Sequence, residues 1–429
     1  MPVPDVSVSR FSVHRQRCSR WLSVAAVGGL LFALAAGSAS AQDLVLRGAT
    51  VMTAGDAGTL DAADVWVRDG RIAAVGPSLA VPAGTAELDA RGRWLTPGIV
   101  DPHSHLATRG DNNETTAPFT PEVRIVDTID PRDREFELAI AGGTTTQLIL
   151  PGSANLIGGQ GVVVKNRIGE PLDGMVVADA PMAVKFAIGE NPIRTHGARG
   201  RTPASRMGSA AALRERFAAL GQVDARGVRA GASDAPRRDS EADRILRELQ
   251  AGRAYAHIHA YRAGEMETLI ALAREAGFTI RAFHHATEAY KIGPQLAQAG
   301  IAAVVWSDWF GVKAEAWDAI PWNAPMLLEQ GVHVALHSDS VDITRRMHHE
   351  AAKVVRYGAT REQALRMVTR DAAWVLGLED RIGSIEPGKD ADLVLWSADP
   401  FGAAARVDAV YIDGQRYFDR ATADAGVAP

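Results

Sequence analysis

The chain has 429 residues, of which 47% are hydrophobic and 23% are charged, and its formal net charge is −5. This composition excludes an intrinsically disordered or collagen-like chain, and the charge gives no sign of a protein that binds nucleic acid. Cys18 is the one cysteine, which excludes a disulfide framework and a zinc site built on cysteines. The length fits about two or three ordinary domains, or one large α/β barrel with an appendage.

Residues 1–41 are expected to be an export signal. Four arginines precede an apolar run over 21–36, and Ala39-Ser40-Ala41 forms a small-residue cleavage site before Gln42. This run is shorter than the roughly 20 residues that a membrane span requires. We therefore expect cleavage and export to the periplasm or the medium, without a stable membrane anchor. An uncleaved anchor is the alternative.

The two ends of the mature chain are predicted to be rich in strands. Residues 43–95 alternate apolar and polar positions around Asp-Gly and Ala-Gly turns, a pattern that favours hairpins. Strand patterns return over 390–397 and 408–418. We expect residues 42–95 and 379–429 to form one small β-sandwich built from both chain ends.

Between residues 96 and 378, short apolar runs alternate with helical stretches. The expected helices are 133–141, 205–220, 240–251, 263–276, 293–299, 344–357 and 361–376. Strands that alternate with helices indicate parallel βαβ units, and around eight of them fit a (β/α)₈ TIM barrel better than an open doubly wound sheet. The segment 191–240, rich in Arg, Gly, Ala and Ser, is expected to be a mobile loop over the barrel mouth with one helix.

Histidines gather at the ends of the predicted strands. The six are His103, His105, His257, His259, His284 and His285. The C-terminal strand ends of a parallel barrel face its active site, and residues two apart on a strand point the same way. Convergent imidazoles are typical of a metal site, whereas hydrogen-bonded histidines at a barrel end are the structural alternative.

Several segments carry a family resemblance. Residues 96–105 (TPGIVDPHSH) resemble the first-strand signature of the amidohydrolase superfamily, and residues 331–339 (GVHVALHSD) resemble its eighth strand. Residues 369–396 are similar to the segment of that superfamily in which the chain passes from the barrel back to the β-sandwich. The chain resembles the branch that contains imidazolonepropionase-like and prolidase-like hydrolases. Residues 151–160 (PGSANLIGGQ) look like the mark of a poorly characterised subgroup there.

The resemblance implies a set of metal ligands. His103 and His105 match the first-strand pair, and Asp339 matches the eighth-strand aspartate. On the fifth strand His259 is the implied ligand, and His257 lies deeper on the same face. His337, two residues before Asp339, is expected to be a residue of the barrel layers rather than a ligand.

On the sixth strand, His284 and His285 are expected to point to opposite sides. The string His-Ala-Thr-Glu-Ala from His285 resembles the His-Gly-Thr-Glu-Ala of the family, which makes His285 the implied ligand. We therefore expect His284 to pack outward.

The ligand that would bridge two metals has two candidates. Many relatives use a lysine carboxylated by CO₂, and Lys185 lies in an apolar run where an ammonium group is costly. Other relatives use a glutamate, and Glu190 is available. A straight strand would place these two residues on opposite faces, so that only one could bridge. A mononuclear site is the third alternative.

These residues predict a metal-dependent amidohydrolase that cuts a C–N bond in an amide, cyclic amide or peptide-like small molecule. Two divalent cations, expected to be Zn²⁺ with Fe²⁺, Mn²⁺ or Co²⁺ as alternatives, would lower the pKa of a water, and Asp339 would transfer its proton to the leaving nitrogen. Tyr261 or His257 could support the oxyanion. The alternatives are a deaminase of the same fold and a non-catalytic metal-binding paralogue. No nucleic-acid partner is expected, and a homo-oligomer stays open.

Overall fold

The computed structural model describes residues 43–227, 240–309 and 311–425. The predicted export signal over residues 1–41 lies outside the described residues, as does the part of the segment 191–240 that spans 228–239. Among the helices of the described ranges, none combines the length and the apolar character that crossing a membrane requires.

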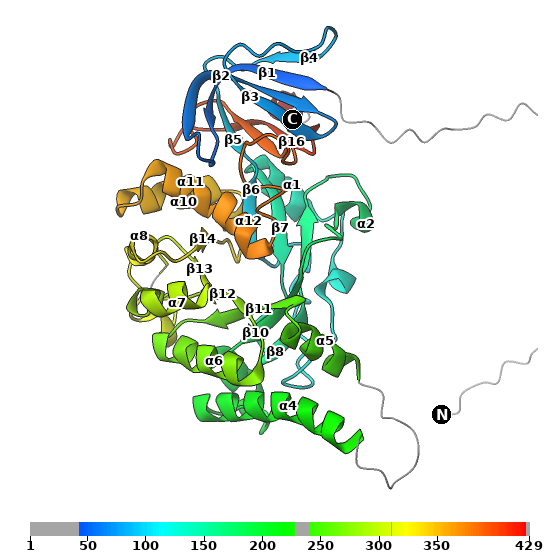
Figure 1. The fold of residues 1–429 in the computed structure, drawn as a ribbon, viewed down its shortest axis with the longest axis vertical. Helices are drawn as coiled ribbons and strands as arrows, with labels where there is room; N and C mark the ends of the chain where they lie inside the picture. Colours follow the sequence, from blue (N-terminus) through cyan, green and yellow to red (C-terminus); the bar gives the residue numbers. More distant parts are fainter. Residues whose placement is uncertain (1–42, 228–239, 310, 426–429) are drawn as a thin grey trace, which may run out of the picture. The chain divides into compact units, whose positions relative to one another are not determined.

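Strands from both ends of the chain form one mixed sheet (Figure 1). Its N-terminal members are β1 (Leu44–Met52), β2 (Thr59–Arg68), β3 (Arg71–Gly76), β4 (Ala86–Asp89) and β5 (Trp94–Pro97). Its C-terminal members are β15 (Leu393–Trp396), β16 (Val407–Ile412) and β17 (Gln415–Asp419). The order is β17-β16-β15-β5-β1-β2-β3, with β4 beside β1. The antiparallel pairing of β5 with β15 joins the two ends of the chain.

Alternate apolar residues drive the formation of this sheet. Val65 and Val67 of β2 are buried in one cluster with Leu393 and Leu395 of β15. The predicted β-sandwich would consist of two sheets, whereas hydrogen bonding links all of these strands into one. The reason is that β1 pairs with β2 along one edge and with β4 and then β5 along the other.

The remaining strands form two further sheets. One has the order β14-β13-β12-β11-β10-β8 and the other the order β6-β7-β9. Their bounds are β6 (Ile99–Ser104), β7 (Thr144–Ile149), β8 (Ile157–Gln160), β9 (Val162–Lys165), β10 (Met182–Ala187), β11 (Ala254–Ala260), β12 (Ile280–His285), β13 (Ala302–Val305) and β14 (Val334–Leu336). Pairing is parallel from β10 to β14 and between β6 and β7, as βαβ units require.

The predicted barrel of eight parallel strands is not what the structure shows. β8 and β9 run antiparallel to their partners β10 and β7, and only Gly161 separates them, so one stretch of chain serves both sheets. Gly159, at φ +125°, takes a conformation that favours glycine within this stretch. Between β14 and β6 the described residues form no ladder, although the Asp339 N–H donates to the His103 carbonyl (3.1 Å). The result is an α/β fold whose barrel strands do not close into one sheet.

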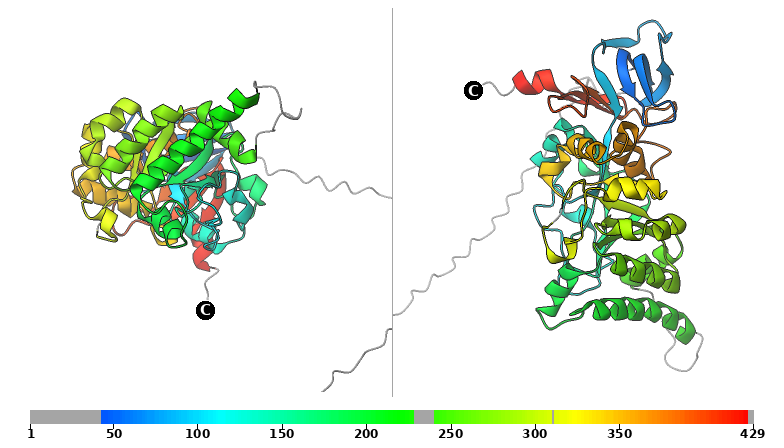
Figure 2. Two further views of the ribbon diagram at one scale, coloured as in Figure 1. Left: turned by 90° about the horizontal axis from the view of Figure 1, so that it is seen from below. Right: turned by 90° about the vertical axis from the view of Figure 1, so that its left-hand side faces the viewer.

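Helices alternate with these strands and pack against them (Figures 1 and 2). Their bounds are α1 (Arg134–Ala141), α2 (Leu172–Met175), α3 (Glu190–Gly197), α4 (Arg206–Gly227), α5 (Glu241–Gln250), α6 (Ala263–Ala276), α7 (Gly293–Ala299), α8 (Asn323–Glu329), α9 (Val341–Thr344), α10 (Met347–Arg356), α11 (Arg361–Met367), α12 (Arg370–Leu376) and α13 (Arg420–Ala425), with short 3₁₀ helices at Ile125–Thr128, Ala289–Lys291 and Ala314–Ala316. α5 contacts β11, α6 contacts β12, and α12 contacts both β6 and β14.

The segment 191–240 differs from the prediction of a loop with one helix. Its described part holds most of α3 and all of α4. α4 buries Leu213, Phe217 and Leu220, and the Phe217 ring stacks on Phe278 at a centroid distance of 4.9 Å. These three positions follow the helical period of 3.6 residues, so α4 corresponds to the helix expected over 205–220, and α3 is the helix that was not expected.

A buried ionic cluster joins β9 to the C-terminal part of the chain. The Lys165 side chain is 1% exposed, and its Nζ lies 2.9 Å from Asp390, 3.0 Å from Asp392 and 2.5 Å from Asp413. Arg167 also pairs with Asp413 (2.7 Å). Removing one partner of a buried ion pair leaves the charge of the other uncompensated, and this destabilises the fold far more than the intact pair stabilises it.

Replacing Lys165 by methionine is therefore expected to destabilise the fold by about 3–5 kcal/mol, the usual cost of an uncompensated buried charge. Urea denaturation followed by circular dichroism measures the change. Arg91→Met is the control, because Arg91 pairs with Asp89 (2.6 Å) at a site where both side chains are more than half exposed. A Lys165→Met protein as stable as the control variant would contradict this interpretation of the cluster.

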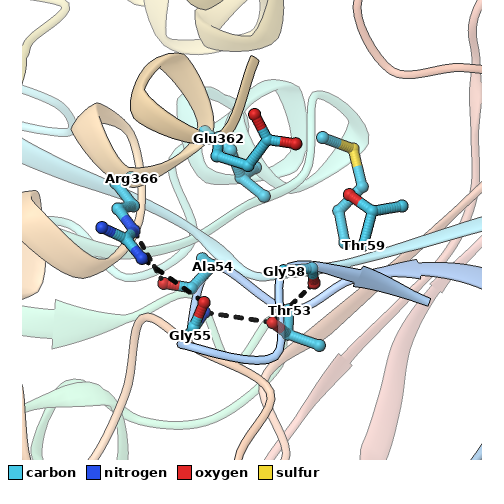
Figure 3. Close-up of a pocket in the computed structure, with 9 residues that line it drawn as sticks. Thr53, Ala54, Gly55, Gly58, Thr59, Glu362 and Arg366 are labelled. Carbon is cyan, nitrogen blue, oxygen red and sulfur yellow. Dashed lines mark hydrogen bonds between the residues drawn. The ribbon is translucent and has the colours of Figure 1, made fainter. Parts of the chain in front are cut away.

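A small pocket lies where the turn after β1 meets α11 (Figure 3). Arg366 donates to the backbone carbonyls of Ala54 (3.3 Å) and Gly55 (3.4 Å), and Thr53 donates to Gly58 (2.7 Å). None of the residues that line it belongs to the predicted site. The pocket therefore lies at the junction between the N-terminal sheet and α11, away from the predicted site.

Candidate metal centre

The predicted site residues lie at the C-terminal ends of neighbouring strands. His103 belongs to β6, Lys185 to β10, and Asp339 follows β14. His105 follows β6, His257 and His259 belong to β11, and His284 and His285 belong to β12. Because parallel strands end at a common edge, these side chains come from five strands to one region.

Three possible ligand atoms converge, one each from His103, His105 and Asp339. The two histidine Nε2 atoms are 3.3 Å apart, and the Asp339 Oδ1 lies 3.2 Å from His105 Nε2 and 3.6 Å from His103 Nε2. His105 Nδ1 lies 2.7 Å from the Leu150 carbonyl, which can only accept, so Nδ1 carries the proton and the Nε2 of the neutral ring a lone pair. The three atoms are of the kinds that ligate a divalent cation and lie close enough together to share one, so this group fits a divalent metal.

A second group of nitrogen atoms extends from His103 to His285 and His337. One ring nitrogen from each lies within 4.8 Å of the others. Neither nitrogen of His337, nor Nδ1 of His285, has a hydrogen-bond partner among the described residues. Burial lowers the pKa of His337 to about 3, which keeps the ring neutral and able to bind a metal. His337 therefore lies within reach of two implied ligands, and its expected place in the barrel layers stays a prediction.

The prediction that His284 packs outward is wrong. His284 is fully buried, and its Nδ1 lies 3.0 Å from His103 Nδ1. Alternation along an extended strand would place His284 and His285 on opposite sides, whereas His285 (φ +70°) and Ala286 (φ +27°) leave the extended conformation. The turn at the strand end rotates His285 inward, so both histidines reach the interior.

The structure separates the two bridging candidates. Lys185 is fully buried in β10, its Nζ lies 3.3 Å from His103 Nε2, and burial lowers its pKa to about 8. Glu190 is not on the strand, because the chain turns at Gly189 (φ +86°) and Glu190 begins α3. In the described part of the chain, the Glu190 side chain makes no hydrogen bond or ion pair with the histidines, while its backbone N–H donates to Glu315 (2.9 Å).

Sequence reasoning missed two polar residues that lie beside His259. Ser153 Oγ lies 2.9 Å from His259 Nδ1, and the Glu315 Oε1 lies 3.8 Å from His259 Nε2. Burial alone would raise the pKa of Glu315, but His259 and Lys313 beside it lower that pKa to about 2. Ser153 lies in the 151–160 segment that the family resemblance singled out. Glu315 lies in a stretch without periodicity, where one sequence offers no signal.

Aromatic rings lead from the histidines toward the surface. The Tyr261 ring stacks on His285 (5.2 Å between centroids), and Trp306 lies 4.7 Å from His285. Trp309 stacks on Trp306 (5.1 Å) and is 40% exposed. His257 is buried, and its Nδ1 lies 3.0 Å from His284 Nε2. Of the two candidates for oxyanion support, Tyr261 is thus the one beside the implied ligands.

Comparison with known proteins places these features in a family. The model of the amidohydrolase family matches residues 192–418. Amidohydrolase tasK of Hapsidospora irregularis is 34% identical over 390 residues, which are 83% of this chain and 40% of tasK. The imidazolonepropionase of Methylobacterium nodulans is 25% identical over 377 residues, or 77% of this chain and 86% of that enzyme.

A solved structure supports the same assignment. The crystal structure of an amidohydrolase from Thermotoga maritima superposes with a TM-score of 0.81 and 38% identity, covering 88% of this chain and all of that one. Amidohydrolase neighbours of this kind imply a TIM-barrel-like fold with an extra domain. The convergent side chains at the strand ends agree with this relationship. The chain belongs to the amidohydrolase family, and it is a hydrolase that acts on carbon–nitrogen bonds.

Proposed function

We propose that this hydrolase depends on divalent metal, held by His103, His105, Lys185, His259, His285 and Asp339, and cuts an amide, a cyclic amide or a peptide-like bond. The observation that carries the proposal is the convergence of His103 Nε2, His105 Nε2 and Asp339 Oδ1, which lie between 3.2 and 3.6 Å from one another. Family relatives named imidazolonepropionase make a cyclic substrate a natural first choice.

The residues of the chain take distinct parts in this reaction. When bound, the metal supplies an activated water and polarises the scissile carbonyl. Asp339, whose Oδ1 lies 3.2 Å from His105 Nε2, takes the proton of the attacking water and delivers it to the leaving nitrogen. Burial raises the pKa of Tyr261, so its O–H stays protonated and can donate to the developing oxyanion.

Metal content tests the proposal directly. Purified protein is expected to hold close to two equivalents of divalent metal by elemental analysis, because the ligand set proposed above includes Lys185, beside His103, as a ligand that could bridge two metals. Exhaustive chelation should abolish hydrolysis of a panel of N-acyl amino acids, dipeptides and cyclic amides, and Zn²⁺ or Co²⁺ should restore it.

The matched control removes a histidine elsewhere. His348 of α10 is buried, and its ring packs at a tilt against Trp396 (4.9 Å between centroids), so His348→Phe should keep the metal, whereas His105→Phe should lose most of it. A folded wild-type protein that hydrolyses the panel after complete chelation would falsify the metal assignment.

The same measurements separate the alternatives. One equivalent of metal together with ammonia release from an aromatic amidine would favour the deaminase, and bound metal without any turnover would favour a non-catalytic paralogue. Lys185 beside His103 supports the hydrolase with two metals over both. Export of the mature chain stays a prediction.

A further inference from the structure

Three buried histidines form a line of hydrogen bonds that ends at the proposed metal centre. His257 Nδ1 lies 3.0 Å from His284 Nε2, and His284 Nδ1 lies 3.0 Å from His103 Nδ1. They come from β11, β12 and β6, and none is more than 2% exposed. His284 and His257 are not among the ligands proposed above.

The distances limit where the protons of this line can be. A contact of 3.0 Å between two ring nitrogens is a hydrogen bond, so it holds one proton, because two lone pairs or two N–H groups would repel. A neutral imidazole carries one N–H. Only two arrangements then satisfy both contacts, one with every N–H directed from His103 toward His257 and one with the reverse order.

The two arrangements differ at the atom that faces the metal centre. In the first, His103 Nδ1 donates to His284 and His103 Nε2 carries a lone pair. In the reverse order, His103 Nε2 carries a proton and cannot bind a metal. That Nε2 faces His105 Nε2 (3.3 Å) and Lys185 Nζ (3.3 Å).

We propose that His284, backed by His257, is a positioning residue that holds the His103 ring in place and sets its tautomer, so that Nε2 presents a lone pair to the metal. This inference rests on the proposed metal centre. Partners that orient a ligand histidine through its second nitrogen commonly affect metal affinity by about 10–100-fold. Here the partner is itself a histidine, so the proton order extends over three rings to His257.

Three substitutions of His284 test the line in the full-length mature protein, with Co²⁺ as the probe and a competing chelator to measure affinity. His284→Phe removes both contacts and is expected to weaken binding by about 10–100-fold. His284→Asn places an amide oxygen near the former Nδ1, where it accepts from His103, and should recover most of the affinity. His284→Gln reaches toward His257 instead and should not.

His348→Phe is the control for the His284 variants. His348→Phe also replaces a buried histidine and should bind Co²⁺ like the wild type. If His284→Phe fails to fold, the comparison of Asn with Gln decides. The inference is overturned if His284→Phe binds within about threefold of the wild type, or if Asn is no better than Gln. A wild-type protein that binds no Co²⁺ instead overturns the proposed function itself.

A spectroscopic reading reports the tautomers without reference to activity. Long-range ¹H–¹⁵N correlation of ¹⁵N-histidine-labelled protein loaded with Zn²⁺ should find the proton on Nδ1 of His103 and on Nε2 of His284 and His257. A proton on Nδ1 of His284 would overturn the proposed order.

Discussion

Replacing Asp339 by asparagine is expected to lower kcat by about 10²–10⁴-fold, the usual effect of removing a positioned proton-transfer group. Asp339 is a base at neutral pH: burial alone would raise its pKa, but the neighbouring side chains of His105, His337 and Lys185 lower the pKa below that of an ordinary aspartate. Asparagine keeps the shape and one oxygen but cannot accept the proton. Steady-state kinetics on a substrate from the panel measures the loss.

Asparagine is also the substitution that the backbone tolerates. Asp339 has φ +51°, a left-handed conformation that asparagine and aspartate adopt more readily than other residues. Asp339→Asn should therefore keep the fold and most of the metal, whereas alanine would add backbone strain to the chemical loss. Metal content and the thermal midpoint, measured on the same preparation, separate these two effects.

A nearby aspartate provides the control. Asp342 lies in the first turn of α9 and pairs with Arg345 (2.8 Å), and its side chain is 66% exposed. Asp342→Asn should leave kcat close to the wild-type value. A near-normal kcat in Asp339→Asn would mean that another residue moves the proton.

Much of the site could be predicted because it follows from strand geometry. Residues two apart on a strand share a face, and this rule alone brings His103 and His105 together. The same rule failed at His284 because it applies only while the strand stays extended. The positive φ of His285 depends on the turn after β12, which no residue pattern in the sequence marks.

The fold, like the site, could be predicted in part from the sequence. Alternating apolar runs and helices identify the parallel strands β10 to β14, because each element has its own period. They do not identify β8 and β9, which are four residues each and lie in a run of glycine and valine. Which sheet such a short strand joins depends on long-range pairing, and that pairing decides whether the barrel strands close into one sheet.

The periodicity of strands and helices does not predict the contacts that loop residues make. Glu315, in the 3₁₀ helix at Ala314–Ala316, lies 3.8 Å from His259 although the two residues are far apart along the chain. His337 could be placed on the same face as Asp339, but its unpaired nitrogens become apparent only once the neighbouring rings are in position.

Replacing Lys185 by alanine is expected to remove most of the metal and the activity, if a carbamate on Lys185 bridges two metals. The physical reason is that burial lowers the pKa of Lys185 to about 8, so that more of the amine is uncharged and able to react with CO₂ at neutral pH. Metal loading of stripped wild-type protein should then depend on bicarbonate, because the carbamate must form first.

Glu190→Gln is the matched comparison, because Glu190 is the other candidate for the bridge and begins α3 close by in the chain. Its backbone N–H, which donates to Glu315, is unchanged by the substitution, so this variant should keep its metal and most of its activity. Small carboxylic acids should partly restore Lys185→Ala by filling the vacated space with a carboxylate, and should do nothing for Glu190→Gln. Bicarbonate-independent loading together with an active Lys185→Ala would instead assign the bridge to Glu190, and elemental analysis of both variants, prepared with and without bicarbonate, decides between the two residues.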